Sequence, residues 1–314
     1  MRISCRLIRK IWYFVGMIIH DISPVAFGFG PVEVRFYSLA FAGGLVSTYL
    51  LLRWIWRREG WGMDDLDSLV VYLFFGLVVG ARLGEVLFYH PEYYFGAPLE
   101  ILKIWKGGLA SHGATIGLLV SYLAFLWGKG GGGMAGGFAA RWTRGIAAVR
   151  RDFWKYADGL AVGIPLAAGF VRIGNFFNSE IVGRVFGEGT GLGVVFVRNG
   201  DDFARHPVQL YEGAWLWLVC LAGLWLWVFG RRLGGRVGEM IRTPGFFLFF
   251  FVGVYFAGRF VLEFFKEYQV LDEVGVLGLG LTMGQWLSVL PVGLAVGWFG
   301  ARAIVKRGGP PGRK

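Results

Sequence analysis

The chain of 314 residues is 55% hydrophobic and 18% aromatic but only 17% charged, and its mean hydropathy is +0.55. Soluble domains usually carry about 25% charged residues, so the composition excludes an ordinary soluble fold. The formal net charge is +11, from 32 Lys and Arg against 21 Asp and Glu. No nucleic-acid recognition module is visible in the sequence, and loops on the cytoplasmic side of a membrane explain the excess better.

The apolar residues fall in runs of about 18–22, the length that crosses about 30 Å of hydrocarbon as a helix. Because irregular backbone cannot face lipid and alternating barrel strands are absent, these runs are predicted to be helices. In chain order the predicted spans are residues 36–52, 69–89, 109–127, 156–178, 211–229, 245–265 and 283–300. The sequence therefore predicts an all-α integral membrane protein, a bundle of about seven transmembrane helices with interfacial arms and a small extracytoplasmic head.

The segments around these spans complete the predicted organisation. Residues 1–35 are an N-terminal extension and interfacial arm, residues 36–300 the seven-span domain, and residues 301–314 a basic cytoplasmic tail. Residues 128–155 begin with a Gly-rich run and continue with basic residues, which predicts a flexible cytoplasmic insertion. Residues 179–210 are the predicted head segment.

Basic residues gather in alternate loops. The loops after the first, third and fifth spans and the C-terminal tail are rich in Lys and Arg, whereas the other loops are poorer in them or balance them with acids. The positive-inside rule places the basic loops in the cytoplasm, so the chain is predicted to start outside and to end inside. The basic residues among the first ten argue for the opposite orientation, but four agreeing segments outweigh them.

Polar residues inside the predicted spans converge on the outer side of the membrane. Ionisable groups are costly there and usually line a site or pair within the bundle. All seven spans contribute to this side: Tyr37, Arg82, Glu85, His112, Arg172, Asn175, Asn178, Tyr211, Glu212, Arg259, Glu263 and Gln285. Because the orientation came from loop charge alone, the convergence predicts a site.

Two charged pairs have spacings that place both members on one helix face. Arg259 and Glu263 are four residues apart, and Arg82 and Glu85 are three apart. Each pair also has the simpler interpretation of a structural ion pair, and a lone His112 is usually a satisfied polar residue. A guanidinium can bind a phosphate through two hydrogen bonds, so the arginines indicate an anionic headgroup such as a phospholipid phosphate.

One stretch is long enough to resemble a known family. Residues 169–184 read GFVRIGNFFNSEIVGR, similar to the pattern G-R-I-G-N-F-x-N-x-E-x-x-G-R of prolipoprotein diacylglyceryl transferases. Further pieces resemble family segments in the same order: GARLG at 80–84, YHPEYY at 89–94, WKGGLASHG at 105–113, RHPVQLYE at 205–212, RFVLEFFKE at 259–267 and MGQWLS at 283–288. The resemblance covers about residues 20–300.

The chain departs from the family pattern at a few positions. Lys266 replaces an Arg, and Ser38 and Ser179 replace usual glycines. Ala114 stands where a second Gly often follows His-Gly, and Val182 where an aromatic residue is common. No charge is lost, so these changes bear on local geometry more than on activity.

The resemblance implies a transfer reaction at the bacterial cytoplasmic (inner) membrane. The diacylglyceryl group of phosphatidylglycerol would move to the lipobox cysteine thiol of a prolipoprotein signal peptide, forming a thioether and releasing glycerol phosphate. This is the first step of lipoprotein maturation, with the active site facing the outer side, membrane lipid around it and no nucleic acid as partner. No metal or organic cofactor is implied, because the sequence shows no ligand set at coordinating spacing.

The resemblance also implies residue roles. Preorganised cations stabilise a phosphate leaving group, and Arg172 and Arg259 are the candidates. A thiol must lose its proton to attack; His112 is the candidate base, with Glu263 or Glu180 as rival partners. The predicted catalytic residues are His112, Arg172, Asn175, Arg259 and Glu263.

The remaining roles concern the lipid headgroup. Asn175 and Asn178 would hold headgroup oxygens as neutral donors, Tyr37 would line the mouth, and Gly183 would allow close approach of the loop after the fourth span. The predicted phosphatidylglycerol-binding residues are Tyr37, Arg82, Arg172, Asn175, Asn178, Glu180, Gly183 and Arg259.

Two other functions are compatible with the same cluster. A membrane lipid or anion transporter could use the same basic cavity, although no internal repeat is visible and the polar groups lie on one side of the midplane. A structural membrane subunit would need the ion pairs only to hold helices together.

Overall fold

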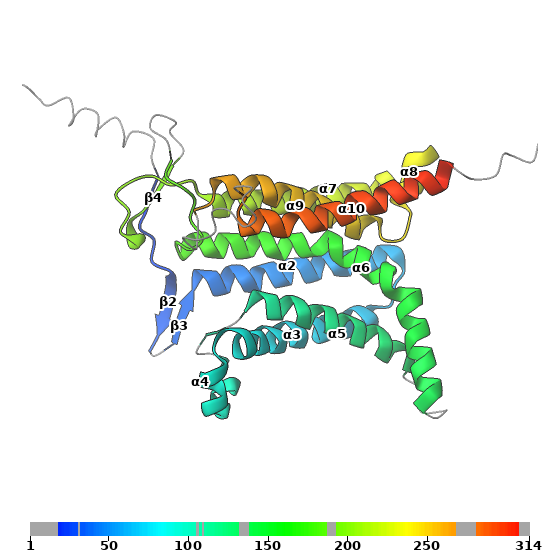
Figure 1. Cartoon of the computed structure of the whole chain (residues 1–314), viewed down its shortest axis with the longest axis horizontal. Helices are drawn as coiled ribbons and strands as arrows, with labels where there is room; N and C mark the ends of the chain where they lie inside the picture. Colours follow the sequence, from blue (N-terminus) through cyan, green and yellow to red (C-terminus); the bar gives the residue numbers. More distant parts are fainter. Residues whose placement is uncertain are drawn as a thin grey trace, which may run out of the picture. The chain divides into compact units, whose positions relative to one another are not determined.

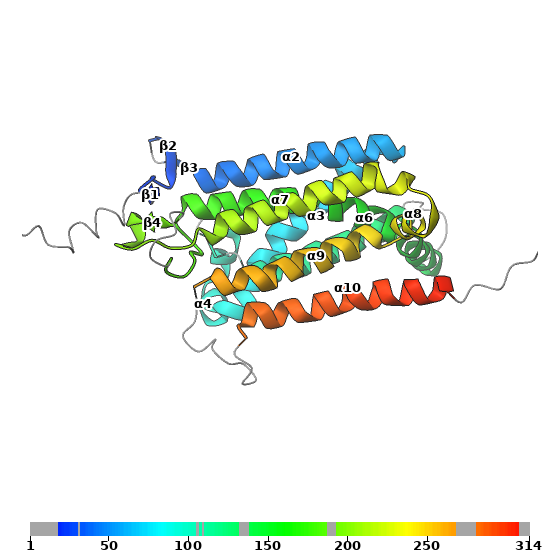
Figure 2. The ribbon, with the colours of Figure 1, turned by 90° about the horizontal axis from the view of Figure 1, so that it is seen from above.

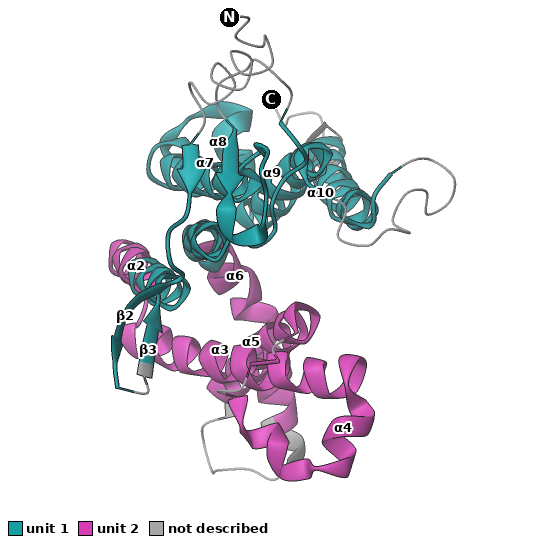
Figure 3. Cartoon of the chain, turned by 90° about the vertical axis from the view of Figure 1, so that its left-hand side faces the viewer, with its two compact units in different colours: residues 1–48, 160–314 teal, residues 49–159 magenta. Residues whose placement is uncertain are grey.

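A computed structural model describes residues 18–30, 32–104, 107–108, 110–131, 138–186, 193–267 and 281–307. Over these ranges the protein is mostly helical (Figure 1). The chain divides into two compact units, unit 1 with residues 1–48 and 160–314, and unit 2 with residues 49–159 (Figure 3).

Every predicted span coincides with a helix. These helices are α2 (Phe36–Glu59), α3 (Met63–Gly84) continued by the π-helical turn η1 (Glu85–Tyr89), α5 (Ser111–Gly131), α6 (Phe138–Phe177), α7 (Val208–Val228), α9 (Phe246–Leu262) and α10 (Met283–Arg307). Within the described residues, six helices are long and apolar enough to cross a membrane, and α5 is not among them. Its glycines, serines and His112 lower its hydropathy. An all-α, multi-pass membrane protein is confirmed, whereas the count of seven is not.

Short elements connect the long helices. They are α4 (Pro91–Gly96), η2 (Pro98–Leu102), η4 (Val197–Asn199), η5 (Gly230–Arg232), α8 (Gly235–Ile241) and η6 (Glu263–Phe265). The predicted insertion at 128–155 is helical where the structure describes it, because its first residues continue α5 and residues 138–155 begin α6. Ala and Arg are frequent in this part of α6 and favour a helix. The rest of the Gly-rich run lies outside the described residues.

Unit 1 is held together by close helix packing. Helix α9 packs against α7 and α10, and the three run side by side in Figure 2. Gly44 of α2 faces α6, where an added Cβ would lie 2.8 Å from the Cβ of Phe170. Trp217 of α7 lies over Gly169 of α6 and donates to the Leu166 carbonyl at 3.3 Å. Lipid tails are as apolar as the helix surfaces, so the hydrophobic effect contributes little to helix association in a membrane. Close packing contacts such as these stabilise the association instead.

Small sheets lie at one end of unit 1. Strand β1 (Ile18–His20) pairs in parallel with β4 (Val194–Phe196), and β2 (Val25–Phe29) pairs antiparallel with β3 (Val32–Arg35), which leads into α2. Open sheet edges cannot face hydrocarbon, so this end of the unit must lie outside the membrane core. The strands fall in the predicted arm and head segments.

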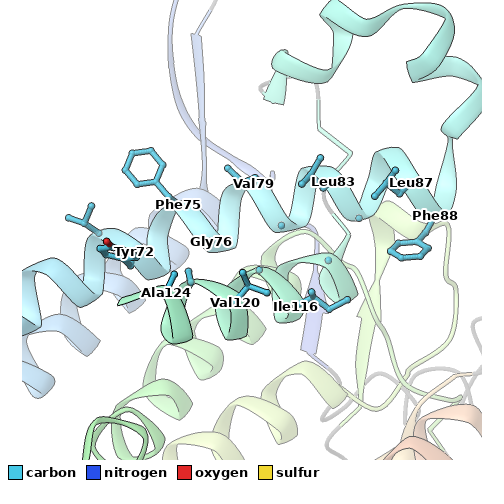
Figure 4. A pocket seen from close by; sticks show the side chains of 16 residues that line it. Tyr72, Phe75, Gly76, Val79, Leu83, Leu87, Phe88, Ile116, Val120 and Ala124 are labelled. Atoms are coloured by element: carbon cyan, nitrogen blue, oxygen red, sulfur yellow. The ribbon is translucent and has the colours of Figure 1, made fainter. Parts of the chain in front are cut away.

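In unit 2, α3 and α5 approach until their backbones touch. Gly76, Gly80 and Gly84 of α3 face Gly113 and Gly117 of α5. A Cβ added at Gly117 would lie only 2.0 Å from the Gly76 carbonyl oxygen, and one at Gly113 2.3 Å from that of Gly80. Glycines four residues apart are the usual means of such contact in membranes. Large apolar side chains beside this seam line an open groove of about 650 Å³ (Figure 4).

Candidate functional site

Two arginines from different helices of unit 1 meet at one small cavity. Arg172 of α6 and Arg259 of α9 line it together with Glu212, Trp215, Leu216, Tyr255 and Leu262. About 10 Å³ is open to the centre of a water-sized molecule, which is room for about one water. The prediction that these two arginines share a site is therefore consistent with the packing of unit 1.

The charges around this cavity do not cancel. Arg172 Nε lies 3.0 Å from Glu212 Oε2, and both side chains are largely buried. Arg259 has no ion-pair partner in the part of the chain that the structure describes. Two guanidinium groups against one carboxylate leave one positive charge, which favours an anion. Glu212 was predicted only as a polar residue of its span, because its pairing with Arg172 joins residues 40 positions apart.

Glu263 does not form the structural pair with Arg259 that their spacing allows. Its Oε2 lies 3.9 Å from Lys266 Nζ, and its carboxylate packs on Gly284 in the first turn of α10. A carboxylate at a helix N-terminus is stabilised by the helix dipole. This position explains how Glu263 can be 8% exposed without Arg259 as its partner.

The loop after α6 gathers side-chain amides around Glu180. Asn175 Nδ2 donates to Glu180 Oε2 at 3.3 Å, and Asn178 Nδ2 donates to Oε1 at 3.2 Å. Gln209 Nε2 donates to the Glu180 carbonyl at 2.6 Å. The amide donors predicted to hold headgroup oxygens are thus directed at Glu180. Gln209 was not predicted as a site residue, although it lies within the RHPVQLYE segment.

The backbone on both sides of Glu180 is strained. Ser179 and Ile181 have φ of 55° and 56°, the left-handed region that non-glycine residues rarely adopt. Ser179 stands where the family pattern has a glycine, which would adopt this conformation at little cost. Here Asn199 Nδ2 donates to the Ser179 carbonyl at 2.9 Å, and Ser179 Oγ lies 3.4 Å from His20 Nδ1. Burial lowers the pKa of His20, so its imidazole is neutral near neutral pH.

Gly183 joins the loop to the end of α9. Its N–H donates to the His206 carbonyl at 3.0 Å, and it forms a β-bridge with Lys266. The next N–H, of Arg184, donates to the Phe265 carbonyl at 2.8 Å. A Cβ at Gly183 would lie 2.4 Å from the His206 oxygen and 2.7 Å from that of Phe265. The close approach predicted for this glycine is present.

Arg205 stabilises the contact between the Gly183 loop and the end of α9. It lies 2.7 Å from both Asp201 and Glu267 and donates to the Gly183 carbonyl at 3.3 Å. Burial opposes its charge, but the hydrogen bonds to the two carboxylates raise the pKa of Arg205 above its usual value. These contacts of Arg205 link the head segment to the Gly183 loop and to the residues that follow α9.

Tyr37 lies at the start of α2 against the end of α6. A Cβ at Gly174 would be 2.8 Å from its ring, so the glycine allows this contact. Gly174 directly precedes Asn175, which places Tyr37 at the same end of α6 as the Glu180 loop. Its predicted contact with lipid stays a prediction.

Arg82 belongs to unit 2, and its donors are engaged. It is 5% exposed, and its guanidinium lies 4.8 Å from the centre of the Tyr94 ring. Its five N–H groups reach five backbone carbonyls at 2.6–3.4 Å: those of Glu100, Ile101, Lys103, Gly107 and Gly108. Arg82 therefore orders the segment that precedes α5, and these bonds do not support direct contact with lipid. Its possible partner Glu85 pairs with His90 instead, at 2.9 Å.

His112 lies in the first turn of α5, also in unit 2, and is exposed. Its role as a base stays a prediction. The other predicted site residues all belong to unit 1: Tyr37, Arg172, Asn175, Asn178, Glu180, Gly183, Arg259 and Glu263.

Comparison with known proteins identifies relatives over most of the chain. The family model described as prolipoprotein diacylglyceryl transferase matches residues 24–131 and 127–300. Three similar proteins are each named phosphatidylglycerol–prolipoprotein diacylglyceryl transferase. The one from Tolumonas auensis is 39% identical over 87% of this chain and 93% of its own. Those from Cupriavidus necator and Bordetella parapertussis are 38% and 36% identical, over 89% and 93% of this chain and 92% and 98% of their own. The chain belongs to the prolipoprotein diacylglyceryl transferase family.

Proposed function

We propose that this enzyme transfers the diacylglyceryl group of phosphatidylglycerol to the lipobox cysteine thiol of a prolipoprotein, at the outer face of a bacterial inner membrane. The names of its relatives supply the two substrates. The observation that carries the assignment to a site is Arg259, which has no acid partner among the described residues, beside the Arg172–Glu212 pair. Such a site suits a phosphate.

In this reaction the cysteine sulfur attacks the diacylglycerol carbon that carries the phosphate. A C–S bond forms, the C–O bond breaks, and glycerol phosphate leaves with the electron pair. The phosphate gains negative charge as the bond breaks, so Arg172 and Arg259 stabilise the transition state more than the bound lipid. Glu212 Oε2 lies beside Arg172 Nε as an ion pair without a hydrogen bond, and the terminal nitrogens of Arg172 remain for the phosphate.

Sealed vesicles that contain the purified protein test reaction and orientation together. A water-soluble lipobox peptide is added outside vesicles made with phosphatidylglycerol, and the peptide mass is followed. We expect a diacylglyceryl thioether only where the arm and head end of the protein faces the peptide. Transport of lipid without modification of the thiol would favour the transporter alternative, and modification only from the opposite face would exclude the proposed orientation.

The role proposed for His112 predicts a pH dependence. If His112 accepts the thiol proton, the wild type should be active at neutral pH, where the substrate thiol is still largely protonated. His112→Gln should be inactive at neutral pH and recover partly above about pH 8.5, where the thiol ionises by itself. His90→Gln, a second exposed histidine in unit 2, should keep the original profile. A folded His112→Gln enzyme with an unchanged pH–rate profile removes His112 from the mechanism.

A further inference from the structure

The hydrogen bonds around Glu180 fix the direction of two amide groups. An ionised carboxylate only accepts hydrogen bonds, so Asn175 and Asn178 must present their NH₂ groups to it. Turning either amide over would place two oxygens against each other. The amide oxygens therefore point away from Glu180.

Both amide oxygens lack a partner. Asn175 Oδ1 and Asn178 Oδ1 are buried and accept no hydrogen bond from any described residue. Asn175 as a whole is only 6% exposed. Buried carbonyl oxygens are nearly always hydrogen-bonded, so two unpaired ones on neighbouring turns of the α6 terminus indicate that a ligand completes them.

The unpaired buried atoms around Glu180 are hydrogen-bond acceptors. They are the amide oxygens of Asn175, Asn178 and Gln209, and Glu180 itself is exposed, with no ion-pair partner among the residues described. A phosphate has no favourable contact with these acceptors. Hydroxyl groups and N–H groups do.

A cationic side chain lies one helical turn from Asn175. Arg172 precedes Asn175 by three residues on α6, which is about 4.5 Å along the helix axis. A ligand whose phosphate lies at Arg172 would carry a short attached alcohol into reach of Asn175, Asn178 and Glu180. This order of charges matches a phosphate bonded to a small polyol better than a peptide backbone, which offers no anion.

We propose that Glu180 and the amide oxygens of Asn175 and Asn178 recognise the hydroxyl groups of the lipid's polyol headgroup. The proposal rests on the proposed function and assigns the selection of phosphatidylglycerol to these acceptors. The arginines then bind the phosphate that all phospholipids share, while the acceptors distinguish one headgroup from another.

Phosphatidylpropanol tests this, because it keeps the phosphate and a three-carbon alcohol but lacks both headgroup hydroxyls. With one lipobox peptide, the wild-type kcat/KM should be higher for phosphatidylglycerol by about 10²–10⁴. Glu180→Gln and Asn178→Ala should lower turnover of phosphatidylglycerol by about 10–100-fold. The same variants should change turnover of phosphatidylpropanol by less than about threefold. The ratio of kcat/KM for phosphatidylglycerol to that for phosphatidylpropanol should therefore fall.

Two control variants separate recognition from general damage. Glu33→Gln alters an exposed carboxylate in the β2–β3 arm and should change neither lipid. Asn199→Ala removes the bond to the Ser179 carbonyl, which loosens the loop and should lower turnover of both lipids equally.

Three results would overturn the proposal while leaving the transferase function intact. They are equal use of the two lipids by the wild type, parallel loss of both in the Glu180 and Asn178 variants, and a raised KM for the peptide with the lipid preference unchanged. The last result would assign the acceptors to peptide N–H groups. Failure of the wild type to modify the peptide with phosphatidylglycerol would remove the proposed function, and this proposal with it.

Discussion

Arg259→Lys and Arg172→Lys should each lower kcat/KM by about 10²–10³, the usual cost of removing one oriented donor from a transition state. A lysine keeps the charge but cannot reproduce the two parallel hydrogen bonds of a guanidinium. Steady-state turnover of phosphatidylglycerol with a lipobox peptide measures the loss.

The two variants should differ in stability. Arg259 has no described acid partner, so its replacement should leave the unfolding temperature in detergent nearly unchanged. Arg172→Lys weakens the contact with buried Glu212, and an unsatisfied buried carboxylate costs about 1–3 kcal/mol or more. Arg35→Lys, an exposed cation in the arm, is the matched control and should be fully active. Normal turnover in both folded variants would contradict the phosphate-binding role.

Gly183→Ala should abolish most of the activity for a different reason. The added methyl would lie 2.4–2.7 Å from atoms of His206 and Phe265, two of them carbonyl oxygens that accept loop N–H groups. Backbone cannot give way without breaking those bonds, and overpacking of this kind costs about 1–3 kcal/mol. The Glu180 loop and the end of α9 would separate, which moves the lipid acceptors away from Arg259.

Gly297→Ala provides the control, because nothing lies within 4 Å of an added Cβ at this position of α10. We expect Gly183→Ala to remain folded, since the contact is local, and to lose at least about 100-fold in kcat/KM, as displacement of a preorganised site does. Limited proteolysis should detect a loosened loop. An active Gly183→Ala enzyme with an intact loop would show that the close approach is not needed.

The helices could be predicted because each needs only a local property, an apolar run of sufficient length. The polar positions could also be found, since a charge within such a run is conspicuous. What each polar group contacts could not be predicted. Arg172 and Glu212 pair across two helices, and no spacing rule connects them. The sequence therefore predicted which residues belong to the candidate site but not the bonds between them.

The direction of hydrogen bonds was the least predictable feature. Asn175 and Asn178 were expected to donate to the lipid, and Arg82 to bind it. The structure directs the two amides at Glu180 and Arg82 at backbone carbonyls. A donor's partner depends on where loops return after leaving the helix, and composition carries no information on that path. Seven spans were predicted on hydropathy, and α5 shows how glycines placed for packing make a helix less apolar.

The five carbonyls around Arg82 have a counterpart in metal-ordered loops. Calcium sites order a loop by surrounding a cation with six to eight oxygens, several of them from the backbone. Here the cation is covalently part of α3. It cannot dissociate, be chelated or be exchanged for another ion, so the hydrogen bonds of these five carbonyls are independent of the divalent ions and chelators in the surrounding solution. A guanidinium also stays charged at any physiological pH, which makes this arrangement a permanent one.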